Sequence, residues 1–381
     1  MKRVVLHGYH GRRNTGDDAF ALLGAWGARE YWRLAEALVV APPDELPVLP
    51  AWGGSVFPPV QRFPGHGRMV RYARLRGNFQ VFSGLIMRWL PRSPRRARAD
   101  FLAASLGLFR LGAIGATLGP FISGEAERYW VEELKHFRFL VLRDRRSYET
   151  ALTFDLPYEP VFGADLALLL GKLGPIERPP GRSGLPLLGV SLSDLFLSLD
   201  PGERSRVDRR VSRSFETVVL LAKRMKLRVR ILEFHGHPED GDAAVSRRLW
   251  EKLAGITEVD YVPYNRDTLT TLGKVAECDA MFTVRLHAGI FSAISGVPFL
   301  QVEYGPKCVD FLDDIGVPAR MRIGDFEVSP EEAARRLGAM LESPEEYRAP
   351  VPETVLARAE RNFTAPRRWF VPEEEERAGG K

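Results

Sequence analysis

The alternation of short apolar runs with longer amphipathic segments is the feature of this sequence that most limits its fold. The predicted strands, such as residues 3–7 and 187–193, alternate with segments whose apolar residues recur at helical spacing. This pattern is typical of parallel βαβ units, because a helix must carry the chain back before a parallel strand can pair. We therefore predict an α/β protein built on parallel sheets.

A stretch rich in glycine and proline divides the alternation into two sets. Residues 171–186 have this composition and are predicted to link two domains. With 381 residues, the chain is long enough for two domains of ordinary size. We place the N-terminal domain at residues 1–175, with an arginine-rich insertion at 62–98, and the C-terminal domain at residues 186–345. Residues 346–381 are predicted to form a helical tail.

Positive charge is concentrated in one part of the chain. The formal net charge is +5, and many arginines lie between residues 68 and 98. A solvated arginine-rich surface explains them, and so do contacts with an anionic membrane, an acidic substrate or nucleic acid. The segment MRWLPRSPRRAR is basic and contains an aromatic residue, a composition that can lie on anionic lipid. No nucleic-acid-binding motif accompanies the charge, so we predict no nucleic-acid partner. The arginines are Arg68, Arg71, Arg74, Arg76, Arg88, Arg92, Arg95, Arg96 and Arg98.

Several features favour a cytoplasmic location. The two cysteines, Cys278 and Cys308, have no CxxC spacing, which fits a reducing compartment. The opening MKRVVLHGYHG contains no apolar core of the signal-peptide type. The longest apolar run, residues 101–122, holds Arg110, and a membrane span there would bury this charge at a cost of about 3 kcal/mol or more. We predict a helix followed by a buried strand in that run.

The segment TVRLHAGI, residues 283–290, carries the most specific chemical signal. Arg285 and His287 are its ionisable residues, and they stand within an apolar window at a predicted strand-to-helix turn. Ligands of open α/β sheets bind at the carboxyl ends of strands, and a helix N-terminus favours anions. A guanidinium matches carboxylate or phosphate, imidazole can move a proton near neutral pH, and the small Ala288 permits close approach. The structural alternative is an arginine paired with a carboxylate beside a core histidine.

A second polar loop follows the first predicted strand. The segment HGYHGRRNTGDDAF, residues 7–20, contains three glycines but neither a dinucleotide-binding nor a Walker pattern. Asn14, Thr15 and Asp17 are each able to cap the helix that follows. A capped turn explains part of the segment. We favour a substrate-facing loop that also includes Gly16.

Other predicted strands also end in polar side chains. Arg143 follows one strand, with Asp144 and Ser147 available to cap the next helix or to orient this arginine. Tyr304 and Lys307 follow another strand and are able to reach a polar cleft. An exposed surface arginine and an ordinary turn remain the alternatives at these two places.

The segment FHGHPED carries side chains of the kinds that bind metal ions. His235 and His237 are followed by Glu239 and Asp240, and a His-x-His pair with acids is able to bind a metal ion. No further ligand set accompanies it. We therefore favour a polar loop at a strand end and predict no metal.

Taken together, these segments resemble the polysaccharide pyruvyl transferase family. GYHGRRNTGDDA is similar to the family's N-terminal loop, with Asp18 where glutamate is usual. GATLGPF, LVLRDRRS and GADLAL, the last with Asp165, resemble three further family motifs. The strongest match is TVRLHAGIFSAISGVPFLQVEYGPKCVDFLDDIG. The chain departs from the family at VFSGLIMRW, where Gly84 is what remains of a glycine-rich loop.

The resemblance implies a fold and an activity. It implies two Rossmann-like parallel-sheet domains in a GT-B-like arrangement with an interdomain cleft, the N-terminal domain on the acceptor side and the C-terminal domain on the donor side. Phosphoenolpyruvate would be the co-substrate, with no cofactor and no metal. The acceptor would be a sugar diol of a cell-surface or cell-wall polysaccharide, or of its lipid-linked precursor. The products would be a pyruvate ketal and phosphate.

The same resemblance suggests roles for the candidate residues. Arg285 and Arg143 would bind the two anionic groups of the donor, helped by the helix terminus at Ala288. His287 would protonate the methylene carbon or shuttle protons with the sugar hydroxyl, and Asp17 or Asp165 would orient or deprotonate the acceptor. Asn14, Thr15, Gly16, Tyr304 and Lys307 complete the predicted substrate-binding set.

Two other functions stay open at this point. A GT-B glycosyltransferase that uses a nucleotide-sugar would place a diphosphate at the same helix terminus. A degenerate, non-catalytic relative associated with the membrane would explain the lost glycine loop and the arginines. In each case we expect a cytoplasmic protein, with peripheral contact at the inner face of an anionic membrane as a further hypothesis.

Overall fold

The chain folds into two α/β units, as predicted. A computed structural model describes residues 3–49, 55–57, 76–91, 94–177, 184–194, 201–324 and 328–372. Contacts between residues group Met1–Arg12, Asp17–Leu169 and Glu353–Lys381 into a first unit. The second unit comprises Arg13–Gly16 and Leu170–Pro352.

A parallel sheet forms the centre of the first unit. Its strands pair in the order β3-β2-β1-β4-β6-β7-β8, and every pairing is parallel. The short β5 (Ile86–Met87) pairs with the end of β6. Central residues such as Val4, Val5 and Leu6 are fully buried, as expected for strands covered on both faces. The other strands are β1 (Arg3–His7), β2 (Glu36–Val40), β3 (Ser55–Phe57), β4 (Phe79–Ser83), β6 (Arg110–Leu118), β7 (Phe137–Leu142) and β8 (Val161–Phe162).

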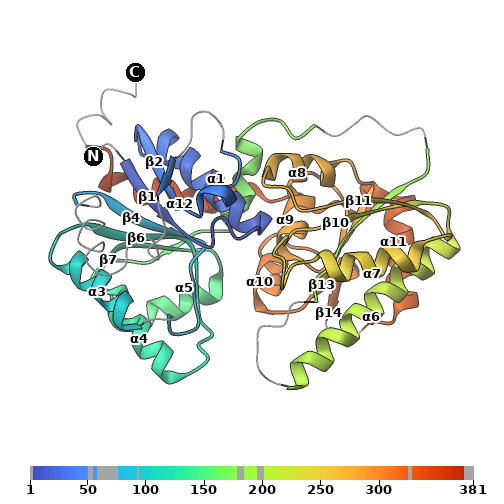
Figure 1. Ribbon diagram of the computed structural model, residues 1–381, viewed down its shortest axis with the longest axis horizontal. Helices are drawn as coiled ribbons and strands as arrows, with labels where there is room; N and C mark the ends of the chain where they lie inside the picture. Colours follow the sequence, from blue (N-terminus) through green and yellow to red (C-terminus); the bar gives the residue numbers. More distant parts are fainter. Residues whose placement is uncertain are drawn as a thin grey trace. The chain divides into compact units, whose positions relative to one another are not determined.

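Helices cover both faces of this sheet. One face carries α3 (Pro94–Ser105), α4 (Gly124–Leu134) and α5 (Arg145–Leu152), and α1 (Thr15–Glu30) follows β1 on the other side (Figure 1). The α3 helix and the buried strand β6 confirm the helix-then-strand prediction for the apolar run at 101–122. None of the helices that the structure describes is long and apolar enough to cross a membrane.

The arginine-rich range 62–98 differs from the predicted insertion. It contains β4, which pairs with both β1 and β6 in the middle of the sheet. Phe79 and Val81 of this strand are fully buried, so hydrophobic burial holds this part of the range inside the domain. Residues 62–75 and 92–93 of the range, with Arg68, Arg71, Arg74 and Arg92, lie outside the described residues.

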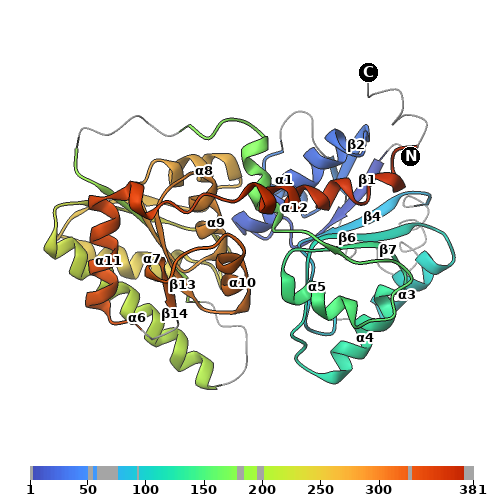
Figure 2. The same ribbon diagram turned by 180° about the vertical axis from the view of Figure 1, so that it is seen from behind.

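The C-terminal segment packs as part of the first unit. Helix α12 (Glu353–Thr364) lies along the sheet beside α1 (Figure 2). The indole of Trp32 donates to the carbonyl of Phe363 at 2.9 Å, and the amide of Gly115 donates to Oδ1 of the buried Asn362 at 2.7 Å. The helical character predicted for this tail is present, but helix and strand are joined by buried hydrogen bonds that the sequence pattern did not reveal.

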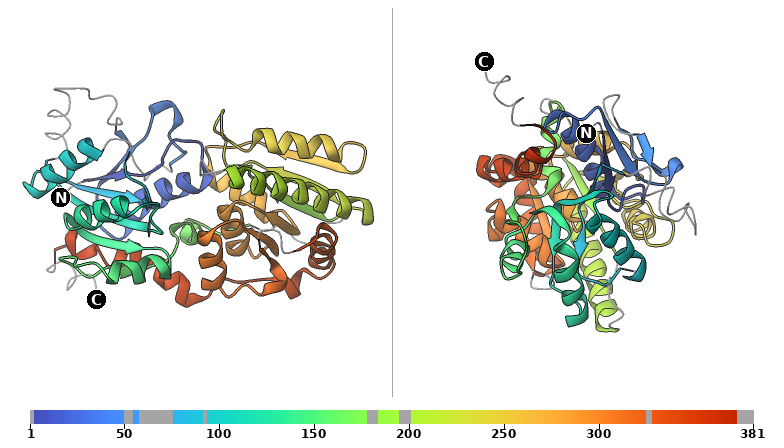
Figure 3. Two further views of the ribbon diagram at one scale, coloured as in Figure 1. Left: turned by 90° about the horizontal axis from the view of Figure 1, so that it is seen from below. Right: turned by 90° about the vertical axis from the view of Figure 1, so that its left-hand side faces the viewer.

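The second unit is also built on a parallel sheet. Its strands pair in the order β11-β10-β9-β12-β13-β14. Helix α6 packs against α7 and α11, and α8 packs against α9; Figure 3 gives two further views of these helices. The strands are β9 (Leu187–Ser191), β10 (Arg228–Leu232), β11 (Glu258–Val262), β12 (Ala280–Thr283), β13 (Phe299–Glu303) and β14 (Arg322–Gly324). The helices are α6 (Pro201–Arg224), α7 (Ala243–Leu253), α8 (Thr268–Ala276), α9 (Leu286–Ile294), α10 (Pro306–Asp314) and α11 (Pro330–Glu342).

Candidate functional site

The turn between β12 and α9 carries Arg285 and His287. The strand ends at Thr283 and the helix begins at Leu286. Arg285 occupies the N-cap position with an extended backbone. The amide of Val284 donates to the carbonyl of Ser191 at 2.8 Å, which ties the turn to the end of β9. The turn therefore stands at the carboxyl edge of the sheet, where α/β proteins bind ligands.

Arg285 is held by a buried carboxylate. Its Nε lies 3.0 Å from Oδ1 and 3.2 Å from Oδ2 of Asp242, and its Nη2 also donates to Oδ1. The exposed fraction is 11% for the side chain of Arg285 and 1% for that of Asp242. Burial opposes the charge on the guanidinium, but Asp242 outweighs this effect and raises the pKa of Arg285. No described residue accepts a hydrogen bond from Nη1.

Asp242 also organises the loop that follows β10. Its Oδ2 accepts hydrogen bonds from the amides of Phe234 at 3.1 Å and His235 at 2.9 Å. Burial raises the pKa of Asp242, against the opposing effects of Arg285 and the two amides. Our sequence interpretation considered Glu239 and Asp240 in this loop and missed Asp242. Its place directly before α7 was the one available signal, since aspartate often stands at a helix start.

His235 stands beside the Arg285–Asp242 pair as a neutral imidazole. Its ring is 3% exposed, and its Nδ1 lies 3.4 Å from Nη2 of Arg285. Burial, followed by the charge of Arg285, lowers the pKa of His235 to about 4. His237 instead contacts Asp240, with Nδ1 and Oδ1 2.5 Å apart. Among the described residues, no group of three or more His, Cys, Asp or Glu side chains is arranged to hold a metal ion.

The glycine loop of the N-terminal sequence meets this turn. The amide of Thr15 donates to the carbonyl of Phe234 at 2.9 Å, and Asn14 forms an isolated β-bridge with His235. These contacts are why Arg13–Gly16 groups with the second unit. Gly16 lies against the imidazole of His287 so closely that a Cβ atom there would overlap the ring. The structure thus brings Asn14, Thr15 and Gly16 to Arg285 and His287.

The cap of α1 differs in part from our prediction. Oδ1 of Asn14 accepts a hydrogen bond from the amide of Gly16 at 3.1 Å, so Asn14 caps the helix as expected. Thr15 and Asp17 lie inside the first turn rather than at the cap. Asp17 belongs to the first unit, whereas Gly16 groups with the second.

Arg143 and Asp165 form a pair in the first unit. Arg143 follows the end of β7, and its Nη1 lies 3.3 Å from Oδ2 of Asp165, with both side chains 8% exposed. Oδ1 of Asp165 accepts from the amide of Ala167 at 2.9 Å. Asp144 caps α5 by accepting from the amide of Ser147 at 2.8 Å. Arg143 is therefore a buried, paired arginine at a strand end and not an ordinary surface arginine.

Tyr304 and Lys307 follow β13 in the second unit. Nζ of Lys307 lies 5.3 Å from the centre of the Tyr304 ring, and the guanidinium of Arg210 lies 5.4 Å from the same ring. Tyr304 is among the groups that raise the pKa of Arg285. Ala288 differs from our expectation, because its amide donates to the carbonyl of Arg285 at 3.1 Å within the turn. That amide is already engaged and does not face an anion.

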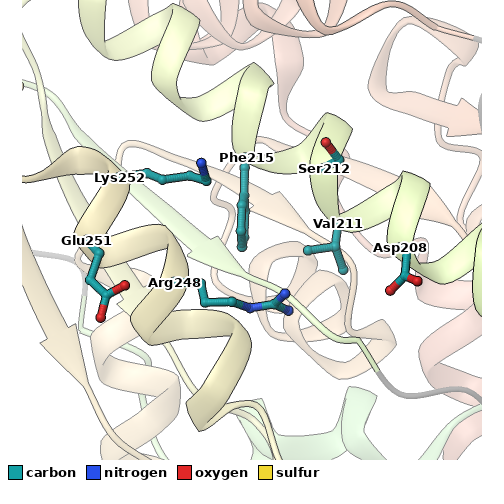
Figure 4. A pocket seen from close by; sticks show the side chains of 7 residues that line it. All are labelled: Asp208, Val211, Ser212, Phe215, Arg248, Glu251 and Lys252. Atoms are coloured by element: carbon teal, nitrogen blue, oxygen red, sulfur yellow. The ribbon is translucent and has the colours of Figure 1, made fainter.

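A surface cavity lies apart from all of these residues. It measures about 520 Å³ and opens between α6 and α7 (Figure 4). No residue of the predicted site belongs to its lining, so the cavity gives no support to that site. The lining residues are Asp208, Val211, Ser212, Phe215, Arg248, Glu251 and Lys252.

Comparison with solved structures shows how widespread this fold is. A Listeria monocytogenes protein assigned as a UDP-N-acetylglucosamine 2-epimerase has a TM-score of 0.62 at 14% identity, covering 98% of this chain and 97% of its own. The UDP-GlcNAc 2-epimerase of Neisseria meningitidis, solved with bound UDP-GlcNAc, has a TM-score of 0.59 at 12% identity, with 94% and 98% covered. The trehalose 6-phosphate synthase of Burkholderia multivorans has a TM-score of 0.50 at 13% identity, with 99% and 97% covered. At these identities the similarity establishes the fold alone.

Sequence comparison identifies the family. A search of curated proteins gave no match. The family model for polysaccharide pyruvyl transferase matches residues 76–306, which is more than half of the chain and includes Arg143, Asp165, Asp242, Arg285 and His287. The chain therefore belongs to the polysaccharide pyruvyl transferase family.

Proposed function

We propose that this protein transfers the enolpyruvyl carbons of phosphoenolpyruvate to two hydroxyls of a saccharide, forming a cyclic pyruvate ketal. Membership of a transferase family that acts on polysaccharides supports the reaction class. The observation that carries the proposal is the β12–α9 turn, where a fixed guanidinium and an imidazole share one strand end. A small donor with a carboxylate and a phosphate needs directed cationic donors and a proton source, and this turn supplies both kinds of group.

Arg285 is the donor-binding residue in this proposal. Asp242 holds its Nε and Nη2 atoms, so Nη1 is the nitrogen left to donate to an oxyanion. Arg143 binds the second anionic group, and Tyr304 and Lys307 line the donor pocket. Phosphoenolpyruvate is the co-substrate, and the proposal invokes no cofactor.

The chemical step starts at the methylene carbon. His287, as imidazolium, transfers a proton to that carbon, and the central carbon becomes electrophilic. A first sugar hydroxyl attacks it, forming a C–O bond, and its proton passes to a base. The bond to the phosphate oxygen then breaks, phosphate leaves with its electron pair, and the second hydroxyl attacks and loses its proton. One proton goes to the new methyl group and one to phosphate, so the two hydroxyl protons balance the reaction.

In this proposal the acceptor contacts the N-terminal glycine loop. Asp17 or Asp165 orients or deprotonates the acceptor, and Asn14, Thr15 and Gly16 contact it. Asp165 is bound to Arg143, with its Oδ2 3.3 Å from Nη1 of the arginine.

Incubation with phosphoenolpyruvate and lipid-linked saccharides tests the reaction. We expect release of inorganic phosphate together with a mass gain of the saccharide that matches a pyruvate ketal. Arg285→Ala and His287→Ala should each abolish both signals. Phosphate release without a change in saccharide mass would contradict ketal transfer, because it would indicate simple hydrolysis.

A nucleotide-sugar reaction is the second candidate. The observation that favours it is the fold, which is shared with an epimerase solved with bound UDP-GlcNAc. Thermal stabilisation separates the two functions: phosphoenolpyruvate, but not UDP-sugars, should raise the melting temperature. Stabilisation by UDP-sugars alone would favour glycosyl transfer. A cellular phenotype unchanged by Arg285→Ala and His287→Ala would instead indicate a non-catalytic relative.

We also propose peripheral contact with the inner, anionic face of the cytoplasmic membrane. The surface proposed to touch the membrane is the exposed side of α3, where Leu102 is 60% exposed and Leu106, directly after the helix, is 72% exposed. They are one helical turn apart and so face the same way. The side chain of Arg98, on the preceding turn, is 66% exposed, although its Nε lies 3.4 Å from Oε1 of Glu133, and in this proposal its outward N–H groups contact acidic lipid. This contact would bring the enzyme to a lipid-linked acceptor.

Flotation with anionic vesicles tests the membrane contact. Wild-type protein should float at low salt and detach at high salt, because Debye screening weakens the electrostatic attraction. The double variant Leu102→Asp/Leu106→Asp should remain unbound. Leu152→Asp is the matched control, since Leu152 is 57% exposed on α5 of the same unit. Equal flotation of the double variant and the control would rule out the α3 surface.

A further inference from the structure

The carboxylate of Asp242 separates its contacts between its two oxygens. Oδ2 accepts from the amides of Phe234 and His235, and these bonds shape the loop after β10. Oδ1 receives the bond from Nη2 of Arg285 and the shorter of the two contacts from Nε. Oδ2 thus holds the backbone and shares Nε of Arg285, whereas the shortest contacts with the guanidinium go to Oδ1.

The pair leaves Arg285 only part of its capacity to bind an anion. The charge of a carboxylate in direct contact offsets most of the guanidinium charge, and the pair lies where water is largely excluded. What remains for a ligand is a set of N–H donors with a fixed direction. Recognition then depends on where Nη1 points, more than on net positive charge.

We propose that Asp242 is a positioning residue for donor binding: it fixes the guanidinium of Arg285 so that Nη1 is presented to the oxyanion of the donor. This inference rests on the proposed function for the identity of the donor, but not for the geometry. His287 lies two residues after Arg285 and packs against Gly16, so a rotated Arg285 would displace the anion relative to the proton donor. Two segments distant in sequence would then act as one donor-binding unit.

The direction of the effect of Asp242→Asn separates positioning from charge compensation. If Asp242 only offsets the charge of Arg285, replacing its carboxylate by a neutral amide makes the net charge of the site more positive. An anion should then bind more tightly. If Asp242 positions Arg285, neutralisation weakens binding. An asparagine can keep its oxygen toward the amides of Phe234 and His235, but its NH2 group then faces the N–H donors of Arg285. The guanidinium would turn away from it.

Asp194→Asn is the matched control. Asp194 also acts on Arg285 through its charge, but it is bound to Arg248 at 3.0 Å and makes no hydrogen bond to Arg285 among the described residues. The control removes one negative charge near Arg285 and leaves the guanidinium contacts intact. It should bind anions as well as the wild type or slightly better.

The experiment measures phosphoenolpyruvate binding by calorimetry and turnover by phosphate release. For Asp242→Asn we expect Kd and KM to rise about 10-fold to 100-fold, the range for losing a charge-assisted hydrogen bond, with a smaller change in kcat. Binding that is unchanged or tighter would overturn the proposal. So would an equal loss in Asp194→Asn.

A spectroscopic readout keeps the test independent of the reaction. The Nε–H of Arg285, identified in labelled protein by its absence from Arg285→Lys, should exchange slowly with solvent in the wild type and rapidly in Asp242→Asn. If the Nε–H loses its protection in Asp242→Asn, but the wild-type protein does not turn over phosphoenolpyruvate, the positioning role stands and the proposed function is wrong. Unchanged protection would reject the positioning role.

Arg285→Lys is the second variant that tests the positioning role, for use if Asp242→Asn fails to fold. A lysine keeps the charge but has a single nitrogen, which Asp242 would engage. Positioning predicts that its affinity for phosphoenolpyruvate falls to that of Arg285→Ala. Retention of wild-type affinity by the lysine variant would mean that charge alone binds the donor, and the inference would be wrong.

Discussion

Replacing Gly16 with alanine gives a direct steric test of the role of His287. Gly16 lies in the first turn of α1, and the three atoms nearest to an added Cβ all belong to the His287 imidazole. The methyl group would overlap the ring. Gly16 is held by the Asn14 cap, and the neighbouring Thr15 by the bond to Phe234, so the backbone resists movement and the ring must shift.

The size of the shift follows from contact distances. Non-bonded carbon atoms rest at about 3.5–4.0 Å, so relieving the overlap requires the ring to move on the order of 1 Å or more. A misplacement of about 1 Å at a reacting group is able to reduce the rate about 100-fold. Helix propensity acts in the opposite sense on stability, since alanine is favoured over glycine by up to about 1 kcal/mol. We therefore expect a large loss of turnover with a small change in stability.

The assay compares phosphate release and thermal unfolding. Gly16→Ala should lower kcat about 100-fold, by the argument above, while the melting temperature stays near that of the wild type. Gly273→Ala is the matched control, because Gly273 is also helical and a Cβ there meets nothing within 4 Å. It should keep full activity.

A double-mutant cycle identifies the route of the effect. If Gly16→Ala lowers the rate by displacing the imidazole, it should cause no further loss of kcat in a His287→Ala background. Full activity of Gly16→Ala would refute the assigned role of His287. An additive loss in the double mutant would show that Gly16 acts on another group.

Two further predictions concern stability. Burial lowers the pKa of His10 from 6.5 to about 3 and that of His235 to about 4, so the unfolded chain binds protons that the folded chain does not. The free energy of unfolding should be at its full value above pH 6.5 and should be lower by about 2 kcal/mol per histidine at pH 5. Urea unfolding at both pH values measures this difference. His10→Gln should lose less of its unfolding free energy between the two pH values than the wild type. Asn362→Ala should destabilise the first unit by about 2–4 kcal/mol, because it leaves the amide of Gly115 and other buried groups unpaired. The exposed Asn265→Ala, measured by the same thermal unfolding, should cost less than half as much, and equal losses would contradict the buried-network argument.

Much of the architecture could be predicted from local patterns. A run of apolar residues with turn signals at each end identifies a strand wherever it occurs, and the crossover helices then require parallel pairing. Strands β6 and β12 and helices α5 and α9 lie close to their predicted positions for this reason. The strand order, with β4 between β1 and β6, was not predictable, because it depends on which apolar faces pack together.

The candidate site shows the same division. Arg285 and His287 were identifiable because ionisable residues are rare in an apolar window, and their spacing at a strand end follows from the chain itself. The partner of Arg285 lies 43 residues away, and the contact of Gly16 with His287 joins residues that are far apart in the chain. No local periodicity encodes such pairs. They arise when the ends of separate strands converge at one edge of a sheet.

The sequence alone therefore determined the α/β class, the family and the position of Arg285 and His287 at a strand end. Tertiary structure decided that Arg285 is bound by Asp242, that Arg143 is bound by Asp165, and that the C-terminal helix belongs to the first unit. The physical reason is the range of the forces involved. Propensity and hydrophobic spacing act over a few residues, whereas the environment of a buried charge is set by whichever distant groups the fold brings within a few ångströms of it.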